Sequence, residues 1–366
     1  MDIDLTDEQR DFTAALTDFC KREAGTREQR GDTPHNQSLY DRMADLGWLG
    51  VTDSGMVDTC LFLEHTAYGM APIGGFATSA IVAGAVRRFG TAEQQKTVVD
   101  GLAGGRTYSI AMSEPEAGSD VAALACRAVP TEDGYVINGQ KTWCSNAHFA
   151  DAILLVARTG DSPGSHNGLT MLLVPTDVPG LRISGIETMG GREVNDLYFT
   201  DCTVPADALV GAEGRGWPQL MAGLNLERLI LAALMLGTAR RAFDDALAFI
   251  RERRQFGRPV GSFQALRHRI ADLATEIECC RLLVYRTAGL VDRDPARVLP
   301  RESSMVKLKT TEVAREVALA GMQMMGGYGY ATEYDMERHV RSTLVATVYG
   351  GTSEIQRDII GKTYGL

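Results

Sequence analysis

The sequence predicts a mainly helical protein with a β domain in its middle third. Helical spacing of apolar residues fills residues 1 to about 105 and returns from Trp217 onward, and strand-length apolar runs lie between these two parts. The chain has 366 residues. It therefore exceeds the roughly 250 to 300 residues at which a single core stops growing. We predict a helical domain over residues 1–105, a β domain over 106–214 and a helical bundle over 215–366.

The first third carries two helix-start signals and no alternating strand pattern. Capping-box motifs begin at Thr6 and at Thr91, and the first opens a helix with Phe12, Leu16 and Phe19 at helical spacing. Further helical stretches are expected at residues 39–46, 61–68 and 81–86.

In the middle third, strand patterns replace helical ones. Residues 136–143 read as a hairpin, because Asn138-Gly139 supplies the positive φ values of a tight turn between alternating residues. Apolar strands are expected at residues 152–157, 169–174 and 197–204. We predict a small antiparallel β domain.

The last third is helical again. Pro218 suits a first helical turn, and leucines crowd all faces of the helix that follows, at positions 220, 224, 229, 231, 234 and 236. Such a helix is expected to be buried. Later helices are predicted at residues 263–292, 302–325 and 352–362.

Composition bounds the class of protein. Hydrophobic residues make up 45% and charged residues 23%, which is ordinary for a globular protein, and the net charge of -10 argues against nucleic acid as a partner. No apolar run reaches the roughly 18 residues of a membrane span. The acidic residues 1–4 do not resemble a signal peptide, so a cytoplasmic protein is expected.

Neither the cysteines nor the histidines have metal-ligand spacing. The seven cysteines are scattered and odd in number, and the six histidines are equally dispersed. We expect reduced, mostly buried thiols and no metal site. A hydrolase-like Gly-x-Ser-x-Gly run at residues 160–164 is set aside, because Pro163 lacks the N–H that the residue after a nucleophile must donate.

A glycine pair near the C-terminus points to an anionic ligand. Gly350 and Gly351 let the main chain approach a ligand closely, Thr352 or Ser353 can cap the next helix, and a helix N-terminus favours negative charge. On spacing alone, a simple loop with a helix cap explains the stretch equally well.

The sequence of this stretch resembles the active-site segment of acyl-CoA dehydrogenases. It reads Tyr349-Gly350-Gly351-Thr352-Ser353-Glu354-Ile355-Gln356-Arg357. That family also has a helical, β, helical order: an N-terminal helical domain, an antiparallel β-barrel domain and a C-terminal four-helix bundle. The resemblance implies FAD as cofactor, with Thr352 and Glu354 among its contacts. Gly350 stands where many members carry the glutamate that removes the substrate's α-proton.

Two segments of the middle third resemble the family's flavin-lining segments. The resemblance places Met112, Ser113 and Ser119 beside the flavin, with Ser119 also at the thioester, and it adds Trp143 and Ser145 from the second segment. Small residues, hydroxyls and free amides suit a planar polar ring. Without the resemblance, these segments read as a Pro/Gly turn and a strand tryptophan in a β core.

Three segments of the last third resemble contacts that the family makes to the FAD of a neighbouring subunit. The implied residues are Arg253, Phe256, Gln264, Gln323, Gly326 and Gly327. An arginine fork suits a pyrophosphate. Alone, the basic run would be a solvated helix end. The family's usual dimer of dimers implies a homotetramer or homodimer.

Glu227 is the candidate for the missing base. It lies in an apolar helix, where an unpartnered carboxylate is costly and has a raised pKa. One hypothesis is a structural ion pair with Arg228 or another arginine. The other comes from the resemblance: in the isovaleryl-CoA and long-chain branches, a glutamate on this helix replaces the missing one. Asn225, Arg228 and Gly351 are the implied substrate contacts.

The implied reaction is FAD-dependent α,β-dehydrogenation of an acyl-CoA to a trans-2-enoyl-CoA. Glu227 takes the α-proton, and the Gly350 backbone N–H stabilises the developing enolate oxygen. The electrons are expected to pass to an electron-transferring flavoprotein. Two alternatives remain: a dehydrogenase or oxidase of acyl-carrier-protein thioesters, and a catalytically silent flavin-binding subunit of a hetero-oligomer.

Overall fold

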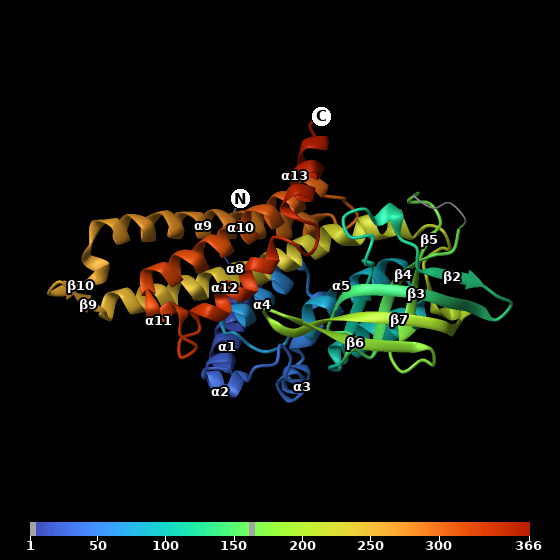
Figure 1. Ribbon diagram of the computed structural model, residues 1–366, viewed down its shortest axis with the longest axis horizontal. Helices are drawn as coiled ribbons and strands as arrows, with labels where there is room; N and C mark the ends of the chain where they lie inside the picture. The colour runs from blue at the N-terminus through green and yellow to red at the C-terminus, as the bar shows by residue number, and fades with distance from the viewer. Residues whose placement is uncertain (1–4, 161–164) are drawn as a thin grey trace. The chain divides into compact units, whose positions relative to one another are not determined.

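The computed structural model describes residues 5–160 and 165–366, which form two compact units (Figure 1). The helical unit comprises Met1–Gly31, Ser54–Ala71 and Glu227–Leu366, and the sheet unit comprises Asp32–Asp53 and Pro72–Leu226. Each unit contains segments from the first third of the chain. The predicted division into domains 1–105, 106–214 and 215–366 therefore stays a prediction. The hydrolase-like run lies outside the described residues except for Gly160.

The helical unit contains long helices and one small hairpin. Its elements are α1 (Asp7–Glu23), α2 (Arg27–Arg30), α4 (Met56–Tyr68), the greater part of α8 (Gly216–Glu252), β9 (Arg254–Gln255), β10 (Arg258–Pro259), η5 (Val260–Ser262), α9 (Gln264–Arg293), α10 (Pro300–Met325), α11 (Gly327–Tyr330), α12 (Met336–Ala346) and α13 (Ser353–Lys362). The α10 helix packs against α9, α12 and α13. These contacts form the helical framework that carries the C-terminal glycine pair.

The capping and helix predictions for this unit are confirmed. The Thr6 hydroxyl accepts from the Gln9 N–H at 3.2 Å, the Gln9 side chain accepts from the Thr6 N–H at 3.1 Å, and Leu16 and Phe19 are buried. The helices α9, α10 and α13 occupy the predicted stretches. The sequence reading missed α12, although Met336, Val340 and Ala346 are buried at helical spacing along it.

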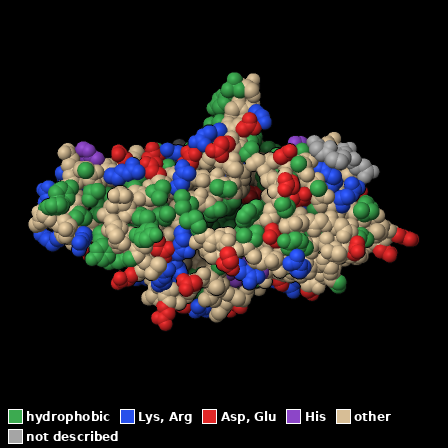
Figure 2. All heavy atoms as spheres, in the orientation of Figure 1, with side chains coloured by type: hydrophobic (Ala, Val, Ile, Leu, Met, Phe, Trp, Pro, Cys, Tyr) green, Lys and Arg blue, Asp and Glu red, His purple; other side chains and the backbone are tan. Residues whose placement is uncertain are grey.

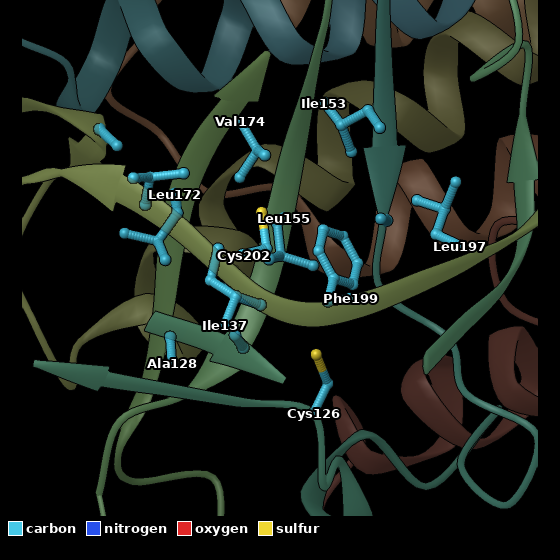
Figure 3. Packing of buried hydrophobic residues seen from close by; sticks show 14 of the residues in the cluster. Cys126, Ala128, Ile137, Ile153, Leu155, Leu172, Val174, Leu197, Phe199 and Cys202 are labelled. Atoms are coloured by element: carbon cyan, nitrogen blue, oxygen red, sulfur yellow. The ribbon is translucent and has the colours of Figure 1, made fainter. Parts of the chain in front are cut away.

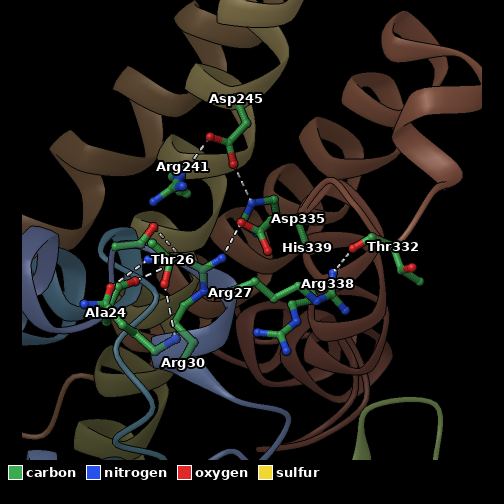
Figure 4. Close-up of polar contacts among 12 residues, drawn as sticks. Ala24, Thr26, Arg27, Arg30, Arg241, Asp245, Thr332, Asp335, Arg338 and His339 are labelled. Atoms are coloured by element: carbon green, nitrogen blue, oxygen red, sulfur yellow. Dashed lines mark hydrogen bonds and ion pairs between the residues drawn. The ribbon is translucent and has the colours of Figure 1, made fainter.

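Polar contacts fasten α12 to its neighbours (Figure 4). Arg30 pairs with Asp335 at 2.5 Å, and His339 pairs with Asp245 of α8 at 3.0 Å. The buried Arg30 guanidinium also donates to the Ala24 carbonyl at 3.0 Å. These contacts satisfy buried polar groups and so fix α12, which leads into the glycine pair.

The sheet unit combines short helices with eight strands. The helical elements are α3 (Gln37–Asp45), η1 (Trp48–Asp53), α5 (Gly75–Phe89), α6 (Ala92–Gln95), η2 (Lys96–Asp100), α7 (Gly101–Ala103), η3 (Val121–Ala123) and η4 (Ala206–Ala208). The strands are β1 (Tyr108–Ala111), β2 (Arg127–Pro130), β3 (Gly134–Ser145), β4 (Ala152–Arg158), β5 (Leu169–Pro175), β6 (Leu181–Thr188), β7 (Gly191–Pro205) and β8 (Leu209–Val210).

The sheet is largely antiparallel, as predicted. Its order is β6-β7-β3-β2-β4-β5-β8, and β1 pairs with β4 in parallel, which the sequence reading did not anticipate. Alternate residues of β3, β4 and β7 pack into one core, where Ile137, Leu155, Phe199 and Cys202 meet (Figure 3). This core supports the segments that lie at the ends of β1 and β3.

The predicted hairpin turn at Asn138-Gly139 is wrong. Both residues lie inside β3, at a bulge where the pairing with β7 shifts register. A β-carbon on Gly139 would lie only 2.8 Å from Cα of Cys126, and the Gly139 φ of +142° suits glycine. The actual turn precedes β3, where the Thr131 N–H donates to the Gly134 carbonyl at 2.8 Å.

The thiol prediction is confirmed: all seven cysteines are free, and six are buried. Within the described residues, α8 is long and apolar enough to cross a membrane, but 59% of its apolar window is buried in the protein, as in a core helix. Figure 2 shows acidic and basic side chains interspersed over the visible face.

Candidate active site

The C-terminal glycine pair forms a loop that only glycine tolerates easily. Gly350 has φ +60° and Gly351 has φ +82°, both in the left-handed region. Thr352 then caps α13 by accepting from the Ile355 N–H at 3.3 Å. The expected loop and cap are therefore present, and Thr352 and Glu354 lie at the N-terminus of α13.

The structure brings Glu227 to Gly350. A β-carbon built on Gly350 would lie 3.6 Å from Oε1 of Glu227 and 2.5 Å from Cδ1 of Leu231. Glu227 and Leu231 are four residues apart on α8, so they share a helix face. Leu231 thus fills the space of a β-carbon at position 350, and the Glu227 carboxylate lies beside it.

The Glu227 carboxylate is buried in apolar surroundings, and its pKa is raised. Its Oε2 is buried and has no hydrogen-bond partner among the described residues. Burial raises the pKa of Glu227, and the nearby charges of Arg228 and Lys307 oppose that rise. Burial also disfavours the charged form of Arg228 and so lowers the pKa of its guanidinium, whereas the charge of Glu227 acts to raise that pKa. An unsatisfied carboxylate oxygen is unusual in a structural ion pair.

Lys307 is a neighbour that sequence reasoning missed. It lies on α10 and is fully buried, and its Nζ donates to the Gly351 carbonyl at 2.8 Å. Burial lowers the pKa of Lys307 to about 8, although Glu227 acts to raise it. The signal was available in the sequence: Lys307 falls on the same stripe of α10 as Val306, Thr310 and Thr311, all of which are buried.

In the sheet unit, a buried ion pair holds the two predicted flavin segments together. Lys141 Nζ lies 2.6 Å from Glu114 Oε1 and donates to the Met112 carbonyl at 2.8 Å. The Thr142 N–H donates to the Ser113 carbonyl at 2.9 Å. Met112 and Ser113 are therefore fixed beside β3.

Trp143 is exposed to solvent and has a positive φ, which is unusual for a tryptophan. It has φ +59° and is 60% exposed, and it lies at the bulge between Lys141 and Cys144. Positive φ is rare for a bulky residue and is costly unless the surroundings require it. Ser145 is half-buried nearby, and its carbonyl accepts from the Ser109 hydroxyl at 2.7 Å. Ser119 is exposed at the other segment.

A second group of predicted residues gathers at the hairpin end of the helical unit. Phe256, at the tip between β9 and β10, has φ +53° and is 92% exposed. The Arg253 guanidinium lies 5.3 Å from the ring centroid of Tyr328 on α11. The remaining predicted residues of this group are also exposed: Gln264, Gln323, Gly326 and Gly327.

The structure does not bring this hairpin group to Glu227. Arg253 follows Glu227 by 26 residues along α8, which at 1.5 Å per residue is about 39 Å. The third predicted group, Asn225 and Arg228, is buried on α8 near Glu227. Along α8 and the hairpin that follows it, the predicted residues therefore form two clusters, one around Glu227 and one at the hairpin. The predicted flavin segments of the sheet unit are a separate group.

Two exposed aromatic residues, Trp143 and Phe256, are suited to contact a planar cofactor. Trp143 and Phe256 each combine a left-handed backbone with a solvent-facing ring, as expected of residues that a ligand or partner covers. The Met112 and Ser113 segment beside β3 adds main chain and a hydroxyl near Trp143. Arg253, three residues before Phe256, adds a guanidinium. These donor types suit the flavin ring and the pyrophosphate of FAD.

Comparisons with known proteins agree over the whole chain. Three family models match: "Acyl-CoA dehydrogenase, N-terminal domain" over residues 6–106, the middle domain over 109–202 and the C-terminal domain over 214–365. The probable acyl-CoA dehydrogenase YngJ of Bacillus subtilis (strain 168) is 34% identical, and the match covers 99% of each chain.

Two further relatives extend the comparison. The mitochondrial isovaleryl-CoA dehydrogenase of Arabidopsis thaliana is 33% identical over 97% of this chain and 91% of that protein. The crystal structure of an acyl-CoA dehydrogenase from Geobacillus kaustophilus superposes with a TM-score of 0.92 at 31% identity, covering 99% of each chain.

Proposed function

Because this chain belongs to the acyl-CoA dehydrogenase family, whose members are FAD-dependent oxidoreductases acting on acyl-CoA, we propose that Glu227 is its catalytic base. In this proposal, Glu227 removes the α-proton of an acyl-CoA thioester while the β-carbon loses a hydride, which yields the trans-2-enoyl thioester. The flavin, when bound, supplies the acceptor for that hydride.

One observation carries the proposal: the Glu227 carboxylate reaches the place of the residue that Gly350 lacks. Its Oε1 lies 3.6 Å from the position of a Gly350 β-carbon. Its Oε2 has no hydrogen-bond partner among the described residues, so it is free to accept a proton. A raised pKa brings a carboxylate closer to the operating pH, which favours general-base catalysis.

The remaining residues bind and orient. Met112, Ser113, Ser119, Trp143 and Ser145 would hold the flavin end of FAD, together with Thr352 and Glu354 at the N-terminus of α13. The glycine at position 350 leaves its backbone N–H available as a donor to the thioester oxygen, where negative charge develops. Asn225, Arg228 and Gly351 would contact the substrate.

The assembly and the electron acceptor are further parts of the proposal. The hairpin cluster of Arg253 and Phe256 follows the end of α8, about 39 Å along the helix direction from Glu227. This distance supports a role at the FAD of another subunit, in a homodimer or homotetramer. We propose an electron-transferring flavoprotein as acceptor, and a cytoplasmic location.

An anaerobic titration tests the proposal. Purified protein with FAD is mixed with straight, branched and cyclic acyl-CoAs and, separately, with acyl-carrier-protein thioesters, and the visible flavin absorption is followed. Bleaching by an acyl-CoA is the expected result and identifies the acyl class. Bleaching by carrier thioesters alone would replace CoA with a carrier protein, and no bleaching by any thioester would contradict the dehydrogenase activity.

A further inference from the structure

Lys307 is a buried lysine that the proposed chemistry leaves unused. A β-carbon on Gly350 would lie 3.6 Å from Glu227 Oε1 and 3.9 Å from Lys307 Cε, so the carboxylate and the lysine stem flank the same glycine. Lys307 Nζ donates to the Gly351 carbonyl at 2.8 Å. A fully buried ammonium group needs compensating contacts. Here the Gly351 carbonyl of the active-site loop supplies such a contact, and the charge of Glu227 favours the ammonium form.

The charges around Lys307 show how it acts on Glu227. The charged groups that face it are Glu227 and Arg228 on α8, Glu312 on its own helix and Glu354 on α13. Burial lowers the pKa of Lys307 to about 8. The ammonium form therefore prevails at neutral pH and opposes the burial that raises the pKa of Glu227.

We propose that Lys307 is a positioning residue for the dehydrogenation, which fixes the main chain of the glycine pair through the Gly351 carbonyl and supplies positive charge toward the Glu227 carboxylate. The inference rests on the proposed role of Glu227 as the base. It gives α10 a role beyond packing, because the same side chain holds the Gly351 carbonyl and favours the ionised form of the Glu227 carboxylate.

An infrared titration of the enzyme without substrate tests this role. The C=O band of the protonated Glu227 carboxyl is identified as the band that Glu227→Gln removes, and its midpoint is measured against pH. Lys307→Gln keeps a hydrogen-bond donor but removes the charge, so the midpoint should rise by about one pH unit. Lys309→Gln, which alters an exposed pair with Glu276 on the same helix, should leave it unchanged.

The outcomes separate this inference from the proposed function. An unshifted midpoint in Lys307→Gln would overturn the electrostatic role, even in an enzyme that thioesters bleach. A protein that no thioester bleaches fails the proposed function whatever the infrared band does.

A second measurement needs no substitution at Lys307. A lysine whose folded pKa is about 8, against about 10.4 when unfolded, makes the free energy of unfolding rise between these two pH values, because the unfolded chain binds more protons there. Glu227→Gln removes a charge that supports protonated Lys307. The rise should then begin at lower pH than in the wild type, and an unchanged onset would count against the coupling.

Discussion

The surroundings of Gly350 leave little room for a side chain at this position. Gly350 is left-handed, and its missing β-carbon would crowd Leu231 and approach Glu227. Glu227, the glutamate predicted to replace the lost base, lies beside Gly350, and that prediction required comparison of two positions far apart in the sequence. Its role as the base stays a prediction. Lys307 escaped prediction because a lysine in a helical pattern usually indicates a solvated face, although its place on the buried stripe of α10 was a signal for its burial.

We expect Gly350→Ala to destabilise the protein. The left-handed conformation costs an alanine about 1–2 kcal/mol, and the new methyl group must also displace Leu231. Chemical denaturation measures the change in the free energy of unfolding. The matched control is Gly361→Ala on α13, where a β-carbon meets no atom within 4 Å, and it should stabilise by about 0.5–1 kcal/mol. Equal effects at both positions would contradict the strain at Gly350.

Sequence patterns predict several strands of the sheet correctly but fail within β3. The strands at β4, β5 and β7 follow from apolar runs and were predicted, but Asn138-Gly139 gives the same signal for a hairpin turn as for a bulge. The choice depends on the close approach of Cys126 to Gly139, a contact between distant residues. The parallel pairing of β1 with β4 is likewise a tertiary result that no local pattern carries.

The Lys141–Glu114 pair is expected to control flavin retention. Glu114 also accepts from the N–H groups of Ala125 and Cys126, at 2.7 and 2.9 Å. Lys141→Met leaves this carboxylate buried without its cation, which costs about 3–5 kcal/mol. We predict a lower unfolding temperature and a lower ratio of bound FAD to protein, measured by absorbance after gel filtration.

The double variant Glu114→Gln/Lys141→Met is the control, because it removes both charges and should recover much of the stability. If the double variant regained stability and FAD equally, the pair would act through folding. Recovered stability with FAD still lost would show that it orients the flavin segments. Full FAD retention in the single variant would refute the prediction.

Across the whole molecule, one cluster of predicted site residues lies around Glu227 on α8, and another lies at the hairpin that follows the end of α8. This separation supports the proposal that each FAD is shared between subunits. The order of helical and β segments was predictable because composition and periodicity change twice along the chain. The division into two compact units was not, because each unit gathers segments distant in sequence.

Phe256 tests the sharing of FAD. We expect Phe256→Ala to weaken FAD binding by about 2- to 10-fold, since a lost aromatic contact is worth about 0.5–1.5 kcal/mol. Quenching of FAD fluorescence measures the Kd, and sedimentation reports the oligomeric state. Val129→Ala, an exposed position on β2, is the control. An unchanged Kd in Phe256→Ala would remove the hairpin from the cofactor site.

The role of Glu227 is tested most directly by the rate constant of anaerobic flavin bleaching in Glu227→Gln, measured by stopped flow with the thioester that bleaches the wild type. The variant should bind FAD normally and bleach about 10²- to 10⁴-fold more slowly, because it lacks the general base. Glu316→Gln, at an exposed pair with Arg269, should react like the wild type. A Glu227→Gln rate within a few-fold of the wild type would contradict Glu227 as the base.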